Sequence, residues 1–167
     1  FGVSVDGTVI VGEGYTDQAQ VEAVRWRNGT IEGLGDLQNG LSTSSAAAVS
    51  HDGTVVVGRG FGQAFRWHNG TMTGLGNLLG GSQSRATGVS ADGRIVVGFG
   101  HNASGNQEAF RWENNTMVGL GVLPGGYSEA TAISADGRVV VGGRVGQVGS
   151  PEAFRWEDGI MTGLGSI

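Results

Sequence analysis

One motif, repeated four times, constrains the fold of this chain more than any other feature. Its copies are VEAVRWRNGTIEGLG (21–35), GQAFRWHNGTMTGLG (62–76), QEAFRWENNTMVGLG (107–121) and PEAFRWEDGIMTGLG (151–165). A second motif runs in step with it: VSVDGTVIVG (3–12), VSHDGTVVVG (49–58), VSADGRIVVG (89–98) and ISADGRVVVG (133–142). Repeats of about 40–45 residues are typical of propellers and solenoids. We therefore treat residues 1–167 as one repeat domain, with units of approximately 1–36, 37–77, 78–122 and 123–167.

Each unit has the pattern of four short strands. In the third unit, we expect strands at 86–90, 94–98, 108–112 and 116–120, with turns at Asp92-Gly93 and Asn114-Asn115. Asn28-Gly29 and Asn69-Gly70 are the corresponding turns in the earlier units. No window has a helical period with a capped start. The sequence therefore predicts an all-β fold, a β-propeller built from four four-stranded repeats, as four blades or as part of a larger ring. A β-solenoid or linear array of the same units is the alternative.

Composition agrees with such a fold and excludes several classes of protein. Glycine supplies 34 of the 167 residues, well above its usual share of about 7%, as expected for many turns and close approaches. The chain has no cysteine, so disulfides and thiolate zinc sites are impossible. Its net charge of −5 without a basic run argues against a nucleic-acid partner. The longest apolar runs fall far short of the roughly 20 residues of a membrane helix, so we expect no membrane insertion.

The chain also resembles known repeat families. The order of strands and turns is similar to that of WD repeats, and the sequence is closer to the HAF-type extracellular repeats of bacterial secreted and surface proteins. Residues 123–142, LPGGYSEATAISADGRVVVG, follow that pattern, as do EAFRW at 152–156 and MTGLG at 161–165. Where the family has its naming histidine, this chain has Glu22, Gln63, Glu108 and Glu152. The resemblance implies a bacterial protein that is secreted or at the cell surface, and it implies no enzymatic activity.

The recurring arginine and tryptophan suggest how the units pack. In a strand such as EAFRW, Phe and Trp share one face while Ala and Arg share the other. We expect the Phe/Trp face of one unit to cover the small Ala/Gly face of the next. A buried guanidinium needs partners, so we expect each of these arginines to pair with an Asp-Gly turn or with carbonyls at a blade junction: Arg25, Arg66, Arg111 and Arg155. An arginine-lined pocket for carboxylates or anionic sugars is the functional alternative.

The sequence offers no constellation typical of catalysis or metal binding. His51, His68 and His101 fall at three different positions of the repeat, so they do not converge as metal ligands would. The serine two residues before each Asp-Gly aspartate recurs four times without a matching histidine, which favours a turn-capping role over nucleophilic catalysis. We therefore predict no enzyme, and no catalytic, cofactor-binding or metal-binding residue.

The most variable segments are the connectors between the predicted second and third strands. They are EGYTDQAQV (13–21), RGFGQ (59–63), FGHNASGNQ (99–107) and GRVGQVGSP (143–151). Variable loops on a fixed scaffold are typical of a binding surface. The candidate ligand-binding residues there are Tyr15, Arg59, Phe61, Phe99, His101 and Arg144.

Three functions remain open at this point. We predict first a non-catalytic extracellular module that binds a protein or glycan partner through these connectors. The alternatives are a structural, self-assembling module, including a homo-oligomer that completes a larger ring, and, third, a polysaccharide-acting enzyme. The chain begins FGVSVDG without a methionine, which suggests a mature or excised piece.

Overall fold

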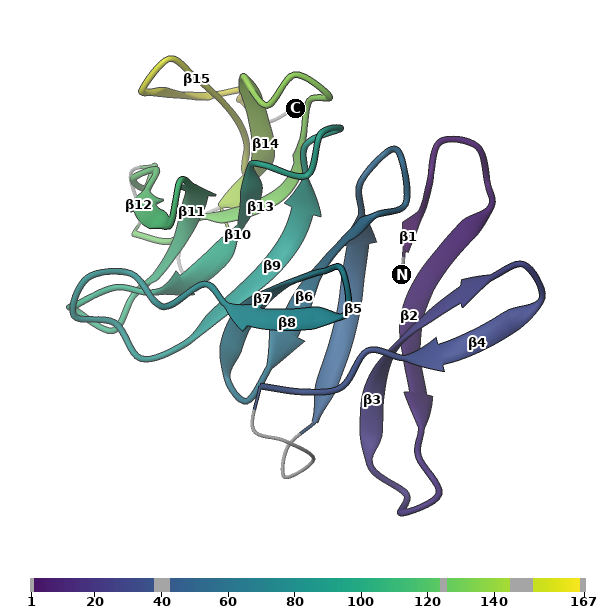
Figure 1. Ribbon diagram of the computed structural model, residues 1–167. Coiled ribbons are helices and arrows are strands. Elements are labelled where there is room, and N and C mark those ends of the chain that lie inside the picture. The colour runs from purple at the N-terminus through teal and green to yellow at the C-terminus, as the bar shows by residue number, and fades with distance from the viewer. Residues whose placement is uncertain (1, 38–42, 124–125, 145–151, 166–167) are drawn as a thin grey trace.

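The protein is an all-β repeat protein of the propeller type. The computed structural model describes residues 2–37, 43–123, 126–144 and 152–165. The described residues form four antiparallel sheets, each with four strands in chain order. We call these sheets blades 1 to 4, and Figure 1 shows that they follow one another in chain order.

The strands have the following bounds. Blade 1 comprises β1 (Gly2–Val3), β2 (Val9–Tyr15), β3 (Val21–Arg27) and β4 (Thr30–Gly33), and blade 2 comprises β5 (Ser44–Val49), β6 (Val55–Gly60), β7 (Gln63–His68) and β8 (Thr71–Gly74). Blade 3 comprises β9 (Ser84–Val89), β10 (Val96–His101), β11 (Gln107–Glu113) and β12 (Thr116–Gly119), and blade 4 comprises β13 (Glu129–Ile133), β14 (Val139–Arg144), β15 (Glu152–Glu157) and β16 (Ile160–Gly163).

The blades fan out from their first strands, as in a propeller. The first strands of successive blades contact one another, and the turns that follow them form a ladder of backbone hydrogen bonds. The N–H of Val5 donates to the carbonyl of His51 over 3.1 Å, His51 donates to Ala91 over 3.3 Å, and Ala91 donates to Ala135 over 3.0 Å. This ladder joins all four blades at their inner edge. The propeller arrangement predicted from the repeat is confirmed, and the linear solenoid is not observed.

Each of these inner turns is closed by the serine and aspartate of its own Ser-x-Asp-Gly motif. In blade 3, the Ser90 hydroxyl donates to Asp92 over 2.6 Å and accepts the N–H of Ile95 over 3.0 Å. The same pair of bonds occurs in the other three blades. The turn-capping role predicted for these serines is confirmed.

The turns between third and fourth strands use left-handed backbone. Asn114 and Asn115 have φ angles of 49° and 61°, and the corresponding pairs in the other blades are also positive: Asn28-Gly29, Asn69-Gly70 and Asp158-Gly159. Two positive φ angles in a two-residue hairpin loop are typical of a type I′ turn, which favours asparagine and glycine. The turns predicted at Asn28-Gly29, Asn69-Gly70 and Asn114-Asn115 are confirmed.

Three separate cores lie between the four blades. Each blade has a front face, which carries Trp and, in blades 2 to 4, Phe, and a back face, which carries Ala and Arg. The front faces of blades 2 to 4 meet the preceding blade, and the back faces of blades 1 to 3 meet the following blade. Between blades 2 and 3, Val57 and Ala64 of one back face pack with Val96 and Phe110 of the next front face. The other two junctions repeat this arrangement. The predicted packing of aromatic face on small face is confirmed, and hydrophobic burial at the junctions holds the blades together.

The two outermost faces of the row are exposed. On the front of blade 1, Ile10 is 47% exposed, whereas its equivalents are fully buried: Val56, Val96 and Val140. On the back of blade 4, Leu164 is 58% exposed, whereas its equivalents are buried: Leu34, Leu75 and Leu120. Within residues 1–167, equivalent positions thus differ in burial according to whether they face a neighbouring blade.

The arginine partners differ from the sequence-based expectation. Only Arg66 makes a bond of the predicted kind, since its Nε donates to the Gly93 carbonyl of the next blade over 3.0 Å. The other three pair with glutamates of their own blade at 2.7 Å: Arg25 with Glu32, Arg111 with Glu113 and Arg155 with Glu157. Within each turn, the serine hydroxyl and a backbone N–H already occupy the aspartate. The three glutamates lie on the same face of the sheet as their arginines and within bonding distance of them. The prediction was therefore wrong for these three arginines.

Candidate functional site

The predicted connector residues lie at one end of the blades, where each second strand passes to the third. We call this end the connector face and define it by Tyr15, Arg59, Phe61, Phe99 and His101. Tyr15 and Phe61 occupy the same position in neighbouring repeats and are 82% and 61% exposed. Phe61 lies in the turn after β6 with φ of 47°. His101 has the equivalent position in blade 3 and is half-buried.

Most of these residues are in strands, although the sequence placed them in connectors. Tyr15 ends β2 and pairs with Val21, and Phe99 and His101 belong to β10, where they pair with Ala109 and Gln107. Arg59 belongs to β6, and Arg144 ends β14. The hairpins continue past the glycine of the VVVG motif because a tight turn beyond it keeps both strands in register. Of the fourth connector, residues 145–151 lie outside the described part of the chain, and the side chain of Arg144 is not described.

The structure brings three of the predicted residues together. Arg59, Phe99 and His101 line an open hollow of about 210 Å³ between blades 2 and 3, along with Gln83 and Arg85. A smaller set, including Glu13 and again Arg59, lines the equivalent hollow between blades 1 and 2. Nδ1 of His101 is buried and has no hydrogen-bond partner among the described residues. Tyr15 lines neither hollow.

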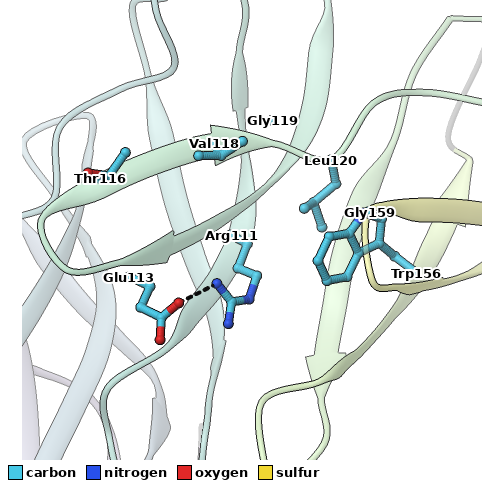
Figure 2. A pocket seen from close by; sticks show the side chains of 8 residues that line it. All are labelled: Arg111, Glu113, Thr116, Val118, Gly119, Leu120, Trp156 and Gly159. Carbon is cyan, nitrogen blue, oxygen red and sulfur yellow. Dashed lines mark hydrogen bonds and ion pairs between the residues drawn. The ribbon is translucent and has the colours of Figure 1, made fainter.

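A larger cleft of about 440 Å³ lies at the opposite end, between blades 3 and 4. Arg111 and Glu113 on β11 form one side, and Trp156 on β15 forms the other, next to Leu120 (Figure 2). Arg111 donates to Glu113 over 2.7 Å, and the two side chains are 23% and 39% exposed. Thr116 on β12 adds a hydroxyl to the same wall.

The same arginine and tryptophan columns are arranged differently at the other two junctions. Between blades 1 and 2, the guanidinium of Arg25 lies over the ring of Trp67, 4.5 Å from its centroid, so that Trp67 is only 5% exposed. Between blades 2 and 3, Arg66 bonds to the Gly93 carbonyl. The hollow beside Arg25 and Trp67 measures about 270 Å³, against about 440 Å³ for the cleft beside Arg111 and Trp156.

The cleft and the hollows contain no catalytic arrangement among the described residues. No group of three or more His, Cys, Asp or Glu side chains there could hold a metal ion. The serines of the inner turns bond to aspartates, and His51, His68 and His101 belong to different elements. No helix in the described ranges could cross a membrane.

A second serine column, which the sequence-based interpretation did not single out, fastens the blades to one another. Ser84 accepts the N–H of Ala64 over 2.9 Å and donates to the carbonyl of Gly76 over 2.6 Å. Ser44 and Ser128 make the same bonds at the other junctions. Each lies six residues before the serine of the Asp-Gly turn, and that constant spacing was the available signal.

The glutamates two residues before the Phe or Val of the third strand also serve the scaffold. Glu22 accepts the N–H of Gly35 over 2.7 Å, and Glu108 accepts that of Gly121 over 3.1 Å. They hold the Gly-Leu-Gly segment after each fourth strand. Glu152 makes the same bond to Gly165 over 3.3 Å, so these three glutamates have a structural role.

Fold and junction geometry define a β-propeller protein, and solved propeller structures match it. TolB from Acinetobacter baumannii matches with a TM-score of 0.70 and 14% identity over 98% of this chain and 42% of that chain. A putative TolB from Agrobacterium tumefaciens matches with a TM-score of 0.73 and 14% identity over 98% of this chain and 63% of its own. A puromycin-hydrolyzing peptidase from Mycobacterium tuberculosis matches at 0.60 and 18% identity, over 98% of this chain and 28% of its own.

These likenesses establish the fold. The chain spans less than two thirds of the length of each of these proteins. No family model matches the sequence, and no curated protein matches it.

Proposed function

We propose that this protein is a non-catalytic bacterial module, secreted or at the cell surface, that binds a protein or glycan partner through its connector face. The extracellular location rests on the resemblance to HAF-type repeats. The non-catalytic role is supported by the lack of a paired nucleophile and base among the described residues of the hollows and the cleft.

The observation that carries the proposal is the exposure of two aromatic side chains at one repeat position. Tyr15 and Phe61 project from the same end of neighbouring blades and are 82% and 61% exposed. Tyrosine and other aromatic residues are enriched at binding surfaces because they supply large contact areas at low entropic cost. Arg59, two residues before Phe61, lines both adjacent hollows. Aromatic residues next to an arginine are typical of interface hot spots.

The test is binding of the purified chain to a glycan array and to bacterial surface polysaccharides and proteins. The double variant Tyr15→Ala/Phe61→Ala removes both exposed rings and should lose most of the binding to a partner that is held by the connector face. Ile160→Ala, which removes an exposed apolar side chain from the opposite end of the blades, serves as the matched control and should bind normally. Equal binding by all three proteins would exclude the connector face.

The exposed end faces favour a second candidate function, self-assembly. The front of blade 1 and the back of blade 4 are the two halves of the interface that each internal junction already forms. A second copy could place its blade 1 against blade 4 of the first, which would cover Ile10 and Leu164. It would also bring Arg155, whose side chain is 45% exposed, toward Trp26 as Arg25 meets Trp67. Such a head-to-tail interface gives a closed ring or an open filament.

Light scattering over a range of protein concentrations tests this candidate. Self-assembly predicts a dimer or larger species that dissociates on dilution. Ile10→Arg and Leu164→Arg should each produce a monomer, whereas Leu79→Arg, at a residue that is exposed in the linker between blades 2 and 3, should not. A monomer at every concentration would contradict self-assembly without affecting the connector face.

A further inference from the structure

We infer that the cleft between blades 3 and 4 binds a neutral sugar residue of a glycan, which stacks on Trp156 and hydrogen-bonds to Arg111 and Glu113. This site is at the opposite end of the blades from the connector face, so the inference stands apart from the function proposed above.

The indole of Trp156 faces an open cleft and can be reached by a ligand. At the junction of blades 1 and 2, Arg25 covers the equivalent Trp67 at 4.5 Å. At the junction of blades 3 and 4, Arg111 instead turns to Glu113, and the cleft opens between them and Trp156 (Figure 2). Leu120 lies beside the indole and extends the apolar wall. The apolar C–H face of a pyranose ring can pack on such a wall and leave water.

The wall that faces the indole is polar. Arg111 offers only donors, while the ionised carboxylate of Glu113 offers only acceptors. The two lie side by side, joined by a 2.7 Å bond. Adjacent hydroxyls of a sugar both donate and accept, so one can accept from Arg111 while its neighbour donates to Glu113. The hydroxyl of Thr116 on the same wall can do either.

The Arg111–Glu113 ion pair disfavours charged ligands. A carboxylate drawn to Arg111 would also meet the carboxylate of Glu113, and a cation drawn to Glu113 would meet the guanidinium. The pair has no net charge, which favours a neutral polyol over the anionic sugar considered from the sequence. A few polar groups facing an apolar wall are typical of small-molecule sites, and a cleft of about 440 Å³ lies within their usual range of about 300–1,000 Å³.

The tryptophan at the first junction differs in accessibility from Trp156, so it serves as a control for binding at the cleft. Trp67 is stacked by Arg25 and almost fully buried, so a sugar has no free indole face there. At the junction of blades 2 and 3, Nε of Arg66 donates to the Gly93 carbonyl, whereas Arg111 pairs with a carboxylate that can also accept from a ligand. Trp156 and Arg111 line one open cleft between two blades, whereas Arg25 covers Trp67 at the first junction.

The experiment titrates the whole chain with methyl glycosides of neutral hexoses and with the corresponding hexuronates, and follows indole signals by NMR. At least one neutral glycoside should bind and shift the Trp156 indole resonance. Trp156→Ala should weaken that binding about tenfold or more, equivalent to at least about 1.4 kcal/mol, while Trp156→Phe, which keeps a stacking ring, should retain most of it. Trp67→Phe should bind as the unmodified chain does.

Glu113→Gln tests the polar wall without removing its hydrogen-bonding capacity. It should raise the affinity for a hexuronate relative to the neutral sugar, because the repelling charge is gone. The Tyr15→Ala/Phe61→Ala variant should bind the neutral glycoside normally, which separates this site from the connector face. Tighter binding of hexuronates than of neutral glycosides by the unmodified chain, a Trp156 signal unmoved at millimolar sugar, or equal binding by Trp156→Ala would each overturn the inference.

Discussion

The guanidinium of Arg25 lies 4.5 Å from the ring centroid of Trp67, across the junction between blades 1 and 2. The contact joins the arginine of one repeat to the tryptophan of the next. It is the only cation–π contact among the described residues, although every blade carries both residue types. The arginine–tryptophan pair therefore forms a stabilising contact at one junction and lines a cleft at another.

We expect Arg25 and Trp67 to be energetically coupled. A double-mutant cycle with Arg25→Met and Trp67→Leu should give a coupling of about 0.5–1 kcal/mol in the free energy of unfolding. The same cycle on Arg111 and Trp156 is the control and should give a value near zero, because no stacking contact joins them. Urea denaturation measures both. Equal couplings at the two junctions would contradict the difference in their geometry.

Phe110 should be among the most costly side chains to truncate. It is fully buried in the core between blades 2 and 3, and Phe→Ala substitutions in such places cost about 3–5 kcal/mol. Val5→Ala, at a side chain that is exposed, should change the free energy of unfolding by less than about 0.5 kcal/mol. Chemical denaturation of both variants provides the comparison, and a loss below about 1 kcal/mol for Phe110→Ala would show that the junction core repacks freely.

Gly98 and Gly143 should respond differently to alanine although both lie in second strands. A Cβ at Gly98 would collide with the carbonyl oxygen of Arg85, whereas a Cβ at Gly143 would meet its nearest atom, the Glu152 carbonyl oxygen, at 3.8 Å. Gly98→Ala should therefore cost at least about 1–3 kcal/mol through backbone displacement. Gly143→Ala should be nearly neutral. Thermal unfolding of the two variants checks the order, and a reversed order would contradict the register of β9 and β10.

Stability should fall in acid because of the four inner turns. Hydrogen bonds from the Ser4 hydroxyl, and then from the Thr8 backbone N–H, lower the pKa of Asp6 from 3.8 to about 2. Serine and backbone donors also lower the pKa of the equivalent aspartates: Asp52, Asp92 and Asp136. A lowered pKa in the folded state means stabilisation that is complete above the unfolded-state pKa and is lost as the pH falls toward the folded-state value.

The expected result is a free energy of unfolding that changes little between neutral pH and about pH 5 and then declines from about pH 4 toward pH 2. Ser90→Ala removes the largest cause of the shift at Asp92, so it should make the acid decline shallower. Denaturant midpoints over a pH series measure this effect. An unchanged acid slope in Ser90→Ala would mean that the inner turns do not govern acid sensitivity.

Several structural features could be predicted from residue types alone. Alternation in the EAFRW strands placed Phe110 and Ala109 on opposite faces, and both are fully buried because each face meets another blade. The Asn-Gly and Asn-Asn pairs specified their turns, since few other residues tolerate two successive positive φ angles. These features depend on bonds and sterics within a few residues, so the local sequence contains the required information.

The partners of the arginines could not be predicted in the same way. Arg25, Arg66 and Arg111 stand in one column, but one stacks on an indole, one bonds to a carbonyl and one borders a cleft. Arg25 and Arg111 pair with glutamates of their own blades, whereas Arg66 reaches a carbonyl of the next blade, and such choices depend on the packing of many residues together. The ends of the second strands were also missed, because hairpin pairing continues beyond the apolar run that marks the strand in the sequence.

By itself, the sequence determined a four-unit propeller-type architecture, the turn conformations and the face that each aromatic residue covers, because repetition and strand alternation act through neighbours along the chain. Only the tertiary structure decided which arginine meets which tryptophan, which faces of the row stay exposed, and where a cleft opens. Those features depend on how one blade sits on the next, and the same residues at the same repeat position take different surroundings at each junction.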